Sequence, residues 1–494
     1  MNRQRLKGLI EQTIGNRLLV TVSHSEPYIT TYIEGEVKWK YAAGGLVTAL
    51  DPIMEACGGL WVAYGAGDAD KEVVDSEGKV NVPPDSPNYA LKRVSLSKSI
   101  VDGYLNGISN RLFWPLCHFV YVRPRFSKRD WEQYKEANKI FADAVLSEIK
   151  EKDAFVWTHD YHMCFCSKYV KEKRPETIGV HFWHIPWPGP EIFKICPWAE
   201  EILEGLLMND LIGFQTKEFA ANFMDCVDQT LEARIDRISS SIFFKNRETR
   251  IRDFPISIDF ENVSRISGGI SEGEIEKLKR YHGIKGDMPV VVGVDRLDYT
   301  KGIPEKLLAI RELLSEHPEL RKKFVFVQVA SPTRAHVYEY QVHGERVLNL
   351  VDKINWQYSE GAWKPVVFIS DFIERDGLIK YLKMGQICLI TSLHDGMNLV
   401  SKEFVAARNG DPGVLILSKF AGSINELKDA IMINPYSVEE IKNSILKALV
   451  MSDEEKRTRM SKMREEVKEH DVFRWAAELV RSVSRLKPNA YEKF

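Results

Sequence analysis

Short apolar runs alternate with amphipathic stretches along most of the chain. The runs are rich in β-branched, aliphatic and aromatic residues, which is typical of strands buried on both faces of a parallel sheet. Apolar positions at helical spacing follow most runs, so the pattern predicts an α/β protein. The predicted strands are Leu18–Val22, Leu60–Tyr64, Ala154–Thr158, Ile178–His184, Leu211–Phe214, Val290–Val294, Phe324–Val329, Val366–Ile369, Ile387–Thr391 and Val414–Leu417, and the clearest predicted helices are Asp130–Lys150, Pro304–Glu316, Val438–Ala448 and Asp453–Glu469.

This alternation is interrupted at about residues 258–288, where a polar helical stretch and the sequence Gly-Asp-Met-Pro precede a new strand. The pattern therefore predicts two α/β units of nearly equal size. Ligands of open α/β sheets bind beyond the carboxyl ends of the strands. Functional residues are accordingly expected in loops such as those after Thr158, His184 and Val294.

Charge and cysteine content narrow the class of protein. The 494 residues include 68 Lys and Arg against 70 Asp and Glu, a net charge of −2, which argues against a general nucleic-acid or membrane-surface binder. No apolar run approaches the ~18–20 residues that span a bilayer, and the first residues lack the apolar core of a secretory signal. The seven cysteines are scattered, and Cys164 and Cys166 lack redox or zinc spacing, so we expect reduced thiols in a cytoplasmic protein.

The segment Gly293–Gly302, GVDRLDYTKG, carries the strongest chemical signal. It places Arg296 and Lys301 between a predicted buried strand and a helix. A guanidinium fork, an ammonium group and helix N–H groups together suit a doubly charged anion. The alternative is that Arg296 only pairs with Asp295 or Asp298 at the surface.

A second segment, Ser392–Glu403, follows the strand predicted at Ile387–Thr391. Its glycine permits close backbone approach to a ligand, and the helix that begins in Asn398–Val400 presents N–H groups suited to phosphate. Glu403 lies on that helix, where it can accept hydrogen bonds from sugar hydroxyls. The alternative for Asp395 is a simple helix N-cap.

Histidines and tryptophans gather in two further segments, HDYH at His159–His162 and VHFWHIPWPGP at Val180–Pro190. Four histidines suggest a metal site, but no HExxH helix exists, and Asp160 and His184 are equally suited to sugar hydroxyls. Aromatic and polar residues that alternate in loops are typical of a carbohydrate pocket. Near the N-terminus, the double glycine of AAGGL opens a predicted helix and suits a diphosphate, although the motif is common.

Together these segments resemble one family, the trehalose-6-phosphate synthases of glycosyltransferase family 20, from about Leu18 to Val480. The order of the motifs along the chain is highly specific. The motifs are AGGL, SNxxxWP (Ser109–Pro115), HDYH, HIPWP, GFQT (Gly213–Thr216), DRLDYTKG, DGMNLVSKE, LSKFAGS (Leu417–Ser423) and NPY (Asn434–Tyr436).

The resemblance implies a retaining GT-B fold, with two Rossmann-like domains that face each other across a cleft. Residues 1–258 would bind the acceptor, 259–470 the nucleotide sugar, and a helix within 471–494 would return to the first domain. The implied reaction moves glucose from a nucleotide-glucose to glucose 6-phosphate and gives α,α-trehalose 6-phosphate. UDP-glucose is the implied donor, with GDP- and ADP-glucose left open. No metal, cofactor, nucleic acid or membrane partner is implied, and a homo-oligomer is expected.

The resemblance also implies roles for individual residues. Arg296 and Lys301 would neutralise the leaving diphosphate, helped by the Gly45 N–H, and a phosphate oxygen of the leaving group would take the acceptor's proton. We name no carboxylate nucleophile. The implied catalytic residues are Arg296, Lys301, His184, Asp160 and Asp395; the donor-binding residues are Gly45, Met397, Asn398, Leu399, Val400 and Glu403; the acceptor-binding residues are Trp114, Arg334, Ser25, Tyr64 and Tyr104.

The sequence departs from the family pattern after its first predicted strand. Ser25 stands where the family carries an arginine that binds the acceptor phosphate, and Glu26 follows it. Tyr64 replaces a tryptophan, and Tyr104 lies beside the position of a family tyrosine. Loss of a charged hydrogen bond costs about 1.5–3 kcal/mol. We therefore keep as an alternative the same donor chemistry on glycerol 3-phosphate, another sugar phosphate or an unphosphorylated sugar. A weakly active regulatory member and a nucleotide-sugar-binding module are further alternatives.

Overall fold

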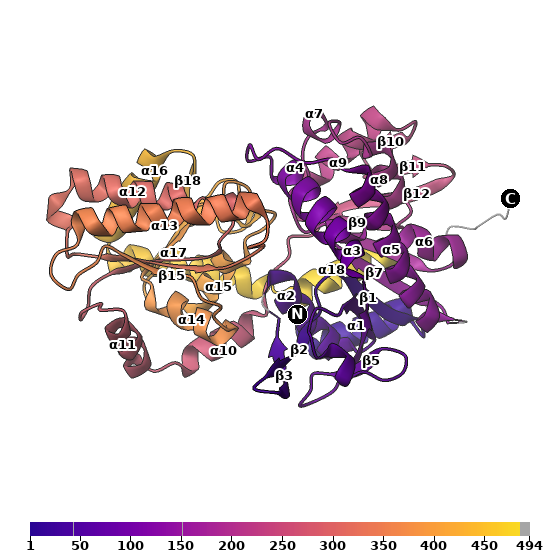
Figure 1. Ribbon diagram of the computed structural model, residues 1–494, viewed down its shortest axis with the longest axis horizontal. Coiled ribbons are helices and arrows are strands. Elements are labelled where there is room, and N and C mark those ends of the chain that lie inside the picture. Colours follow the sequence, from indigo (N-terminus) through magenta and orange to yellow (C-terminus); the bar gives the residue numbers. More distant parts are fainter. Residues whose placement is uncertain (43, 151, 485–494) are drawn as a thin grey trace. The chain divides into compact units, whose positions relative to one another are not determined.

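The computed structural model describes residues 1–42, 44–150 and 152–484. The chain forms two compact units (Figure 1). The first unit comprises Met1–Ile256 together with the segment that begins at Val472, and the second comprises Ser257–Asp471. Each unit is built on its own mainly parallel sheet.

The first unit contains a ten-stranded sheet and a two-stranded hairpin. Its strands are β1 (Leu18–Ser23), β2 (Tyr28–Ile33), β3 (Glu36–Tyr41), β4 (Leu60–Tyr64), β5 (Lys79–Val82), β6 (Tyr89–Val94), β7 (Ala154–His159), β8 (Ile178–Phe182), β9 (Leu211–Phe214), β10 (Arg234–Asp236), β11 (Ser241–Phe244) and β12 (Arg247–Asp253). Its helices are α1 (Arg3–Ile14), α2 (Gly45–Cys57), α3 (Lys98–Val101), the π-helix η2 (Asp102–Phe113), α4 (Trp114–His118), α5 (Lys128–Ile149), α6 (Cys166–Lys173), α7 (Pro190–Phe193), α8 (Ala199–Leu206), α9 (Lys217–Thr230) and α18 (Val472–Ser484), with 3₁₀ turns η1 (Asp70–Glu72) and η3 (Tyr161–Met163).

The order of strands in this sheet creates a binding edge. The central strands run β6-β4-β1-β7-β8-β9, all parallel, which is the order of a dinucleotide-binding fold. The chain builds outward from β1 to β4 and β6 and then returns to β7 on the other side of β1. The carboxyl ends of β1 and β7 therefore form the topological switch point, where ligands bind in such folds.

The second unit repeats this plan with a six-stranded sheet in the order β15-β14-β13-β16-β17-β18. Its strands are β13 (Val290–Arg296), β14 (Val325–Ser331), β15 (Val366–Ile369), β16 (Ile387–Ile390), β17 (Val414–Ser418) and β18 (Ile431–Ile433). Its helices are α10 (Phe260–Gly269), α11 (Glu272–Tyr281), α12 (Ile303–Glu316), α13 (Tyr338–Tyr358), α14 (Arg375–Met384), α15 (Leu399–Ala407), α16 (Val438–Val450) and α17 (Asp453–Glu469), with 3₁₀ turns η4 (Tyr299–Lys301), η5 (Pro318–Leu320) and η6 (Gly422–Asn425).

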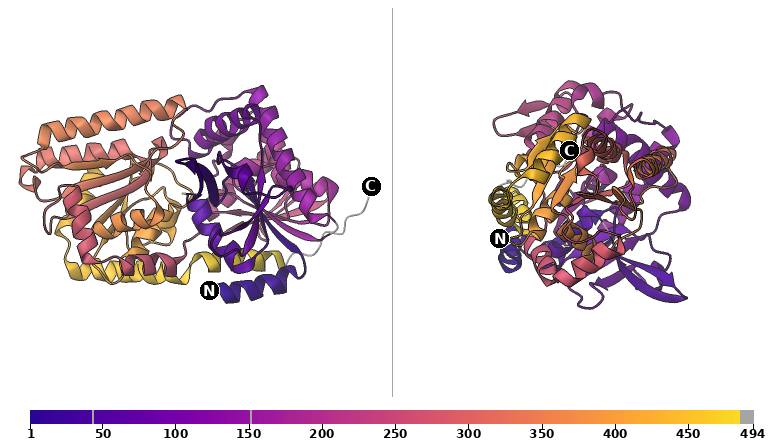
Figure 2. Two further views of the ribbon diagram at one scale, coloured as in Figure 1. Left: turned by 60° about the horizontal axis from the view of Figure 1, so that its bottom comes forward. Right: turned by 90° about the vertical axis from the view of Figure 1, so that its left-hand side faces the viewer.

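Helices cover both faces of this second sheet. α12, α13 and α16 lie on one face, and α10, α14 and α15 lie on the other (Figures 1 and 2). Both faces of the strands are thus buried, which explains why the predicted strands read as continuous apolar runs. The switch point lies between the carboxyl ends of β13 and β16.

All ten predicted strands are present, seven of them with different ends. β8 ends at Phe182, so His184 lies in the following loop, where its N–H bonds to the side chain of Asp160. The β2–β3 hairpin and the β10–β12 meander were not predicted. At most part of each of these strands is buried, so their pattern differs from the fully buried runs of the central sheet, and their pairing depends on neighbouring strands. The helix expected within 471–494 is α18, and residues 485–494 lie outside the described ranges.

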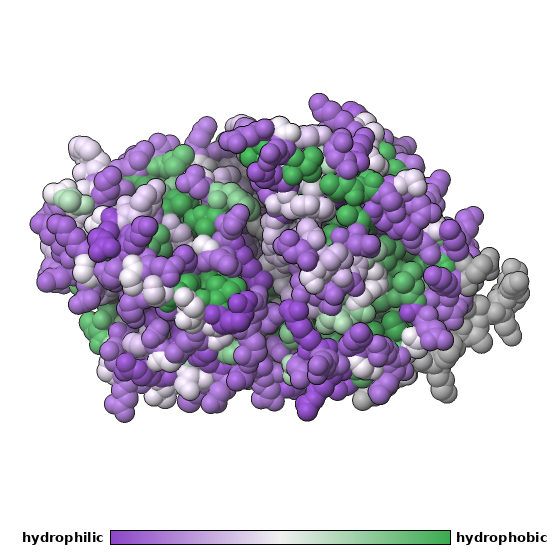
Figure 3. Space-filling model, turned by 90° about the horizontal axis from the view of Figure 1, so that it is seen from below, coloured by the Kyte–Doolittle hydropathy of each residue, from purple (hydrophilic) through white to green (hydrophobic). Residues whose placement is uncertain are grey.

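The surface shows no large apolar feature on the face drawn in Figure 3, where hydrophobic residues form separate patches in a mainly hydrophilic surface. Among the described helices, none combines the length and the apolar character that crossing a bilayer requires. All seven cysteines are unpaired thiols.

Candidate active site

The switch point of the second unit joins the two motifs that carry the strongest sequence signals. Lys301 ends the turn η4 after β13, and Asp395 lies in the loop between β16 and α15. The Lys301 ammonium donates to Asp395 Oδ2 at 2.6 Å, and both side chains are only 12–13% exposed. Residues separated by 94 positions are thus brought into one ion pair.

Asp395 is held by several donors at once. The Ser392 hydroxyl and the Asn398 side-chain amide each donate to Asp395 Oδ2 at 3.1 Å, in addition to Lys301. The alternative that Asp395 caps α15 is wrong. The cap is Asn398, which has a φ of +72° and accepts from the Ser401 N–H at 3.0 Å. Asp395 therefore fixes the position of the Lys301 ammonium.

A second carboxylate, Asp298, organises the two arginines. It is fully buried and accepts from the Thr300 N–H at 3.0 Å, and Arg334 and Arg296 lie 3.4 and 3.9 Å away. Burial alone would raise the pKa of Asp298, but Arg296, Arg334, the Thr300 N–H and Lys301 outweigh it and hold that pKa well below its usual range. The sequence suggested Asp298 only as a surface partner of Arg296, which is 42% exposed.

Arg334 lies in the second unit, just after β14, with a φ of +47°. Its guanidinium also donates to the Tyr340 hydroxyl, which in turn donates to Asp298 at 3.2 Å. Asp295, the other suggested partner of Arg296, instead pairs with the buried Lys306 at 2.5 Å. Arg296, Lys301 and Arg334 against Asp298 and Asp395 leave one net positive charge at the carboxyl ends of β13, β14 and β16, which favours an anionic ligand.

The remaining donor-site residues predicted in this unit lie on or before the first turns of α15. The N–H groups of Leu399 and Val400 open the helix, where intrahelical acceptors are lacking. Met397 is buried, and its carbonyl accepts from the Ser423 N–H at 2.9 Å. Glu403 is half-buried, and burial raises its pKa, opposed by Arg375. These groups suit the phosphates and hydroxyls of a nucleotide sugar.

In the first unit, Asp160 and His184 meet beyond β7 and β8. The His184 N–H donates to Asp160 Oδ1 at 3.2 Å, and its ring Nε2 lies 3.1 Å from Nδ1 of His159. Asp160 has a φ of +69°, a conformation that is strained for a residue with a side chain. Within the described ranges, no group of three or more His, Cys, Asp or Glu side chains could hold a metal ion.

His24, which follows β1, is the centre of an aromatic cluster at the switch point. Its ring stacks on Tyr64 and on His162, with centroids 5.6 and 4.8 Å away. The Tyr104 hydroxyl lies 3.4 Å from His24 Nδ1. Tyr104 itself lies in the π-helix and is fully buried, so it contacts His24 from within the core.

Ser25 is exposed beside this cluster, and its carbonyl accepts from the Ser23 hydroxyl at 2.7 Å. Glu26 points inward: it is 2% exposed, pairs with Arg93 at 2.8 Å and accepts from the Ala66 N–H. The Glu26 carboxylate is therefore turned away from an anion bound at Ser25. The carboxylate instead anchors the loop after β1 from within the unit.

The other two predicted residues of this unit lie on helices. Trp114 begins α4 and is 5% exposed, with its ring 4.0 Å from that of His118. Gly45 is exposed and begins α2, preceded by Gly44 at a φ of +150°, which only glycine adopts readily. The Gly45 N–H therefore lies at a helix N-terminus, as a diphosphate contact requires.

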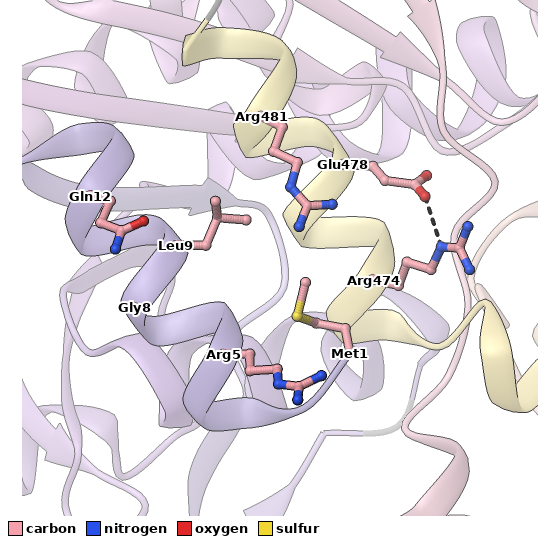
Figure 4. Close-up of a pocket in the computed structure, with 8 residues that line it drawn as sticks. All are labelled: Met1, Arg5, Gly8, Leu9, Gln12, Arg474, Glu478 and Arg481. Atoms are coloured by element: carbon pink, nitrogen blue, oxygen red, sulfur yellow. Dashed lines mark hydrogen bonds and ion pairs between the residues drawn. The ribbon is translucent and has the colours of Figure 1, made fainter.

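A pocket of about 550 Å³ lies elsewhere in the first unit, between α1 and α18 (Figure 4). Arg5, Arg474 and Arg481 line it, and Arg474 pairs with Glu478 at 2.9 Å. None of the predicted site residues lines this pocket, so it is not the catalytic site.

The buried histidines of this unit are expected not to titrate near neutral pH. Burial lowers the pKa of His159, His181 and His184, so all three stay neutral while their unfolded counterparts gain protons below about pH 6.5. This favours unfolding as the pH falls. Glu26 and Asp51, whose pKa values burial raises to about 7 and about 6, act in the opposite direction.

Because these contributions to stability oppose one another, the pH dependence of unfolding does not test the histidines alone. The protonation of each histidine ring must be observed directly. Side-chain ¹⁵N spectra recorded from pH 7.5 to 5.5 should show the three rings neutral throughout. Conversion of any of them to imidazolium in the folded protein would contradict the expectation.

Comparison with known proteins identifies the family. The model of glycosyltransferase family 20 matches residues 12–485. The UDP-forming α,α-trehalose-phosphate synthase of Candida albicans is 33% identical over 479 residues, 96% of this chain and 97% of that protein.

Two solved structures are similar over nearly the same span. A trehalose-6-phosphate protein from E. coli bound with UDP-2-fluoro glucose has a TM-score of 0.84 at 30% identity, covering 95% of this chain and 99% of that one. A UDP-forming synthase from Burkholderia xenovorans in complex with glucose-6-phosphate has a TM-score of 0.85 at 27% identity, covering 94% and 99%. Together with the architecture of both sheets, these matches show that the chain has the GT-B fold and belongs to glycosyltransferase family 20.

Proposed function

We propose that this chain transfers glucose from UDP-glucose to the anomeric hydroxyl of glucose 6-phosphate and releases UDP. The C1–O bond to the diphosphate breaks, a new C1–O bond forms with the α configuration kept, and the acceptor proton leaves with UDP or solvent. The product is α,α-trehalose 6-phosphate. The observation that carries this proposal is the Lys301–Asp395 pair at the switch point of the second unit, with Arg296 paired to Asp298, in a chain similar to synthases over nearly its whole length.

Charge stabilisation of the leaving diphosphate is the main catalytic task. Lys301 and Arg296 supply it, because they are held in place by Asp395 and Asp298 before a ligand arrives. The N–H groups of Gly45, Leu399 and Val400 add donors for phosphate oxygens. Glu403 accepts from the ribose hydroxyls.

Retention without a carboxylate nucleophile fits this arrangement. Asp395 Oδ2 already accepts three hydrogen bonds, and Asp160 Oδ1 accepts the His184 N–H. Neither carboxylate is arranged as the free nucleophile that retaining glycoside hydrolysis uses. A phosphate oxygen of the leaving group is therefore assigned the acceptor's proton, on the face from which the diphosphate departs.

Within the first unit, the acceptor is assigned to the His24 cluster and Trp114, and the acceptor role of Arg334, a residue of the second unit, stays a prediction from the sequence. A different acceptor, raised by Ser25, is not favoured, because the family relatives are named as trehalose-phosphate synthases and one solved relative holds glucose-6-phosphate. The cytoplasmic location, the homo-oligomeric state and the lack of nucleic-acid or membrane partners stay predictions from the sequence.

The test is nucleotide release from UDP-, GDP- and ADP-glucose, each with glucose 6-phosphate, glycerol 3-phosphate, glucose or no acceptor. We expect fast release only with UDP-glucose and glucose 6-phosphate together. Fast release with another acceptor alone would overturn the acceptor assignment, and no release in any combination would overturn the transferase function.

A matched pair of variants tests the acceptor loop. His24→Ala should raise KM for glucose 6-phosphate by about 10-fold or more, since a hydrogen bond to a charged phosphate contributes roughly 1.5–3 kcal/mol. Ser25→Ala should leave KM within about 3-fold, because its exposed hydroxyl has no hydrogen-bond partner among the described residues. The reverse order of effects in steady-state kinetics would move the phosphate contact to Ser25.

A further inference from the structure

Two histidines at the carboxyl ends of β7 and β8 form a hydrogen-bonded pair. His159 is the last residue of β7 and has no exposed surface, whereas His184 is half-buried in the loop after β8. Nδ1 of His159 lies 3.1 Å from Nε2 of His184. Burial lowers the pKa of both rings, so each is a neutral imidazole with one donor and one acceptor nitrogen.

The surroundings of His159 decide which of its nitrogens carries the proton. Its Nε2 is buried without a hydrogen-bond partner, and so is the indole N–H of Trp157, whose ring centroid is 4.8 Å from that of His159. A buried N–H without an acceptor is rarer and costlier than an unused lone pair. A proton on Nε2 would add a second unpartnered donor beside Trp157. The proton therefore belongs on Nδ1, which donates to His184.

This assignment fixes the state of His184. Its Nε2 accepts from His159, so its own proton lies on Nδ1. Nδ1 has no hydrogen-bond partner among the described residues. Unlike Nε2 of His159, it is not fully buried, so it is accessible to a ligand. Asp160 holds the same residue by its backbone N–H at 3.2 Å. Two consecutive residues, His159 and Asp160, thus orient His184 from two sides.

We propose that His159 is a positioning residue that locks His184 in its Nδ1–H tautomer, so that His184 presents a neutral N–H donor to a hydroxyl or phosphate oxygen of the nucleotide sugar. The ligand part of this inference rests on the proposed function. Without His159, His184 would be free to carry its proton on Nε2. Its Nδ1 would then offer a lone pair, which repels a phosphate oxygen.

The tautomer is read directly from long-range ¹H–¹⁵N spectra of the full chain with ¹⁵N-labelled histidine, without substrate. His184→Asn is used only to assign the His184 signals. We expect a protonated Nδ1 and an unprotonated Nε2 in the wild-type chain. His159→Asn, whose amide reaches the Nδ1 position, should keep that pattern, and His159→Phe should shift it toward the Nε2–H form. A wild-type His184 protonated on Nε2, or an unchanged pattern in His159→Phe, would overturn the proposal.

His181 on β8 provides a matched control. It is equally buried, also has an unpartnered Nε2, and bonds through Nδ1 to the Thr158 hydroxyl at 2.9 Å rather than to His184. His181→Phe should therefore leave the His184 tautomer unchanged, even if it destabilises the unit to a similar degree. An equal tautomer shift in His181→Phe would show that core disruption, not the His159 hydrogen bond, sets the tautomer.

Kinetics add a second readout. His159→Phe should lower kcat/KM for the donor by about 3–10-fold, the value of one neutral hydrogen bond, and His159→Asn should restore it. An equal loss of kcat/KM in both His159 variants would contradict the positioning role. If the wild-type chain shows no transferase activity, the proposed function fails, and the spectra alone still decide the tautomer assignment.

Discussion

Replacement of Lys301 by alanine is expected to lower kcat by about 10²–10³-fold, the cost of removing one preorganised donor to a developing anion. In the structure the Lys301 ammonium lies 2.6 Å from Asp395, in a site where both side chains are mostly buried. The variant removes the cation assigned to the leaving diphosphate. KM for glucose 6-phosphate should change little, because Lys301 is assigned to the donor. Steady-state kinetics with UDP-glucose measure both parameters.

Lys306 offers a control in the same unit. It forms a buried pair with Asp295 at 2.5 Å, but it lies within α12 and is assigned no contact with the substrate. Lys306→Met should lower the free energy of unfolding while the folded enzyme keeps its kcat. A Lys301→Ala enzyme with wild-type kcat would remove Lys301 from the catalytic residues.

Replacement of Asp298 by alanine is expected to destabilise the second unit by about 3–5 kcal/mol, because it removes the buried carboxylate with which Arg296 and the mostly buried Arg334 pair. Asp298 joins Arg296, Arg334, Thr300 and Tyr340, so the variant should also lose activity through misplacement of both arginines. Urea unfolding at neutral pH, monitored with a probe within the second unit, measures the loss of stability.

The pH dependence of that loss distinguishes charge from packing. The pKa of Asp298 is held below its unfolded value, so its stabilisation is present above about pH 4 and is lost as the pH falls through the folded pKa. Asp298→Asn, which keeps the shape, should therefore be clearly less stable than the wild type at pH 7, and the difference should shrink below about pH 4. Equal stability at pH 7 would contradict the electrostatic role.

The fold was largely predictable because both central sheets are buried on two faces. Apolar runs such as Leu60–Tyr64 and Val366–Ile369 correspond to strands with the same bounds. The segments that hold Lys301, Asp160 and Asp395 could be placed for the same reason, since ligand loops follow strand ends, whereas Arg296 is the last residue of β13 itself. The β2–β3 hairpin could not be predicted, because its alternation includes several exposed charged residues and its register depends on cross-strand pairing.

Local sequence patterns could not predict which distant segments contact each other. The Lys301–Asp395 and His159–His184 contacts join residues 94 and 25 positions apart, and only the strand order brings them together. Asp298 appeared as an ordinary surface partner, although burial and four neighbouring groups make it central to the arginine cluster. Tyr104, predicted to bind the acceptor, is fully buried with its hydroxyl 3.4 Å from His24 Nδ1, and its acceptor role stays a prediction.

The most direct test of the central claim is NMR identification of the product made from UDP-glucose and ¹³C-labelled glucose 6-phosphate. The account predicts one UDP per disaccharide phosphate and an α,α-1,1 linkage, with label in the phosphorylated ring only. A β linkage, a linkage through a carbon other than C1, label in the other ring, or free glucose as the sole sugar product would contradict it.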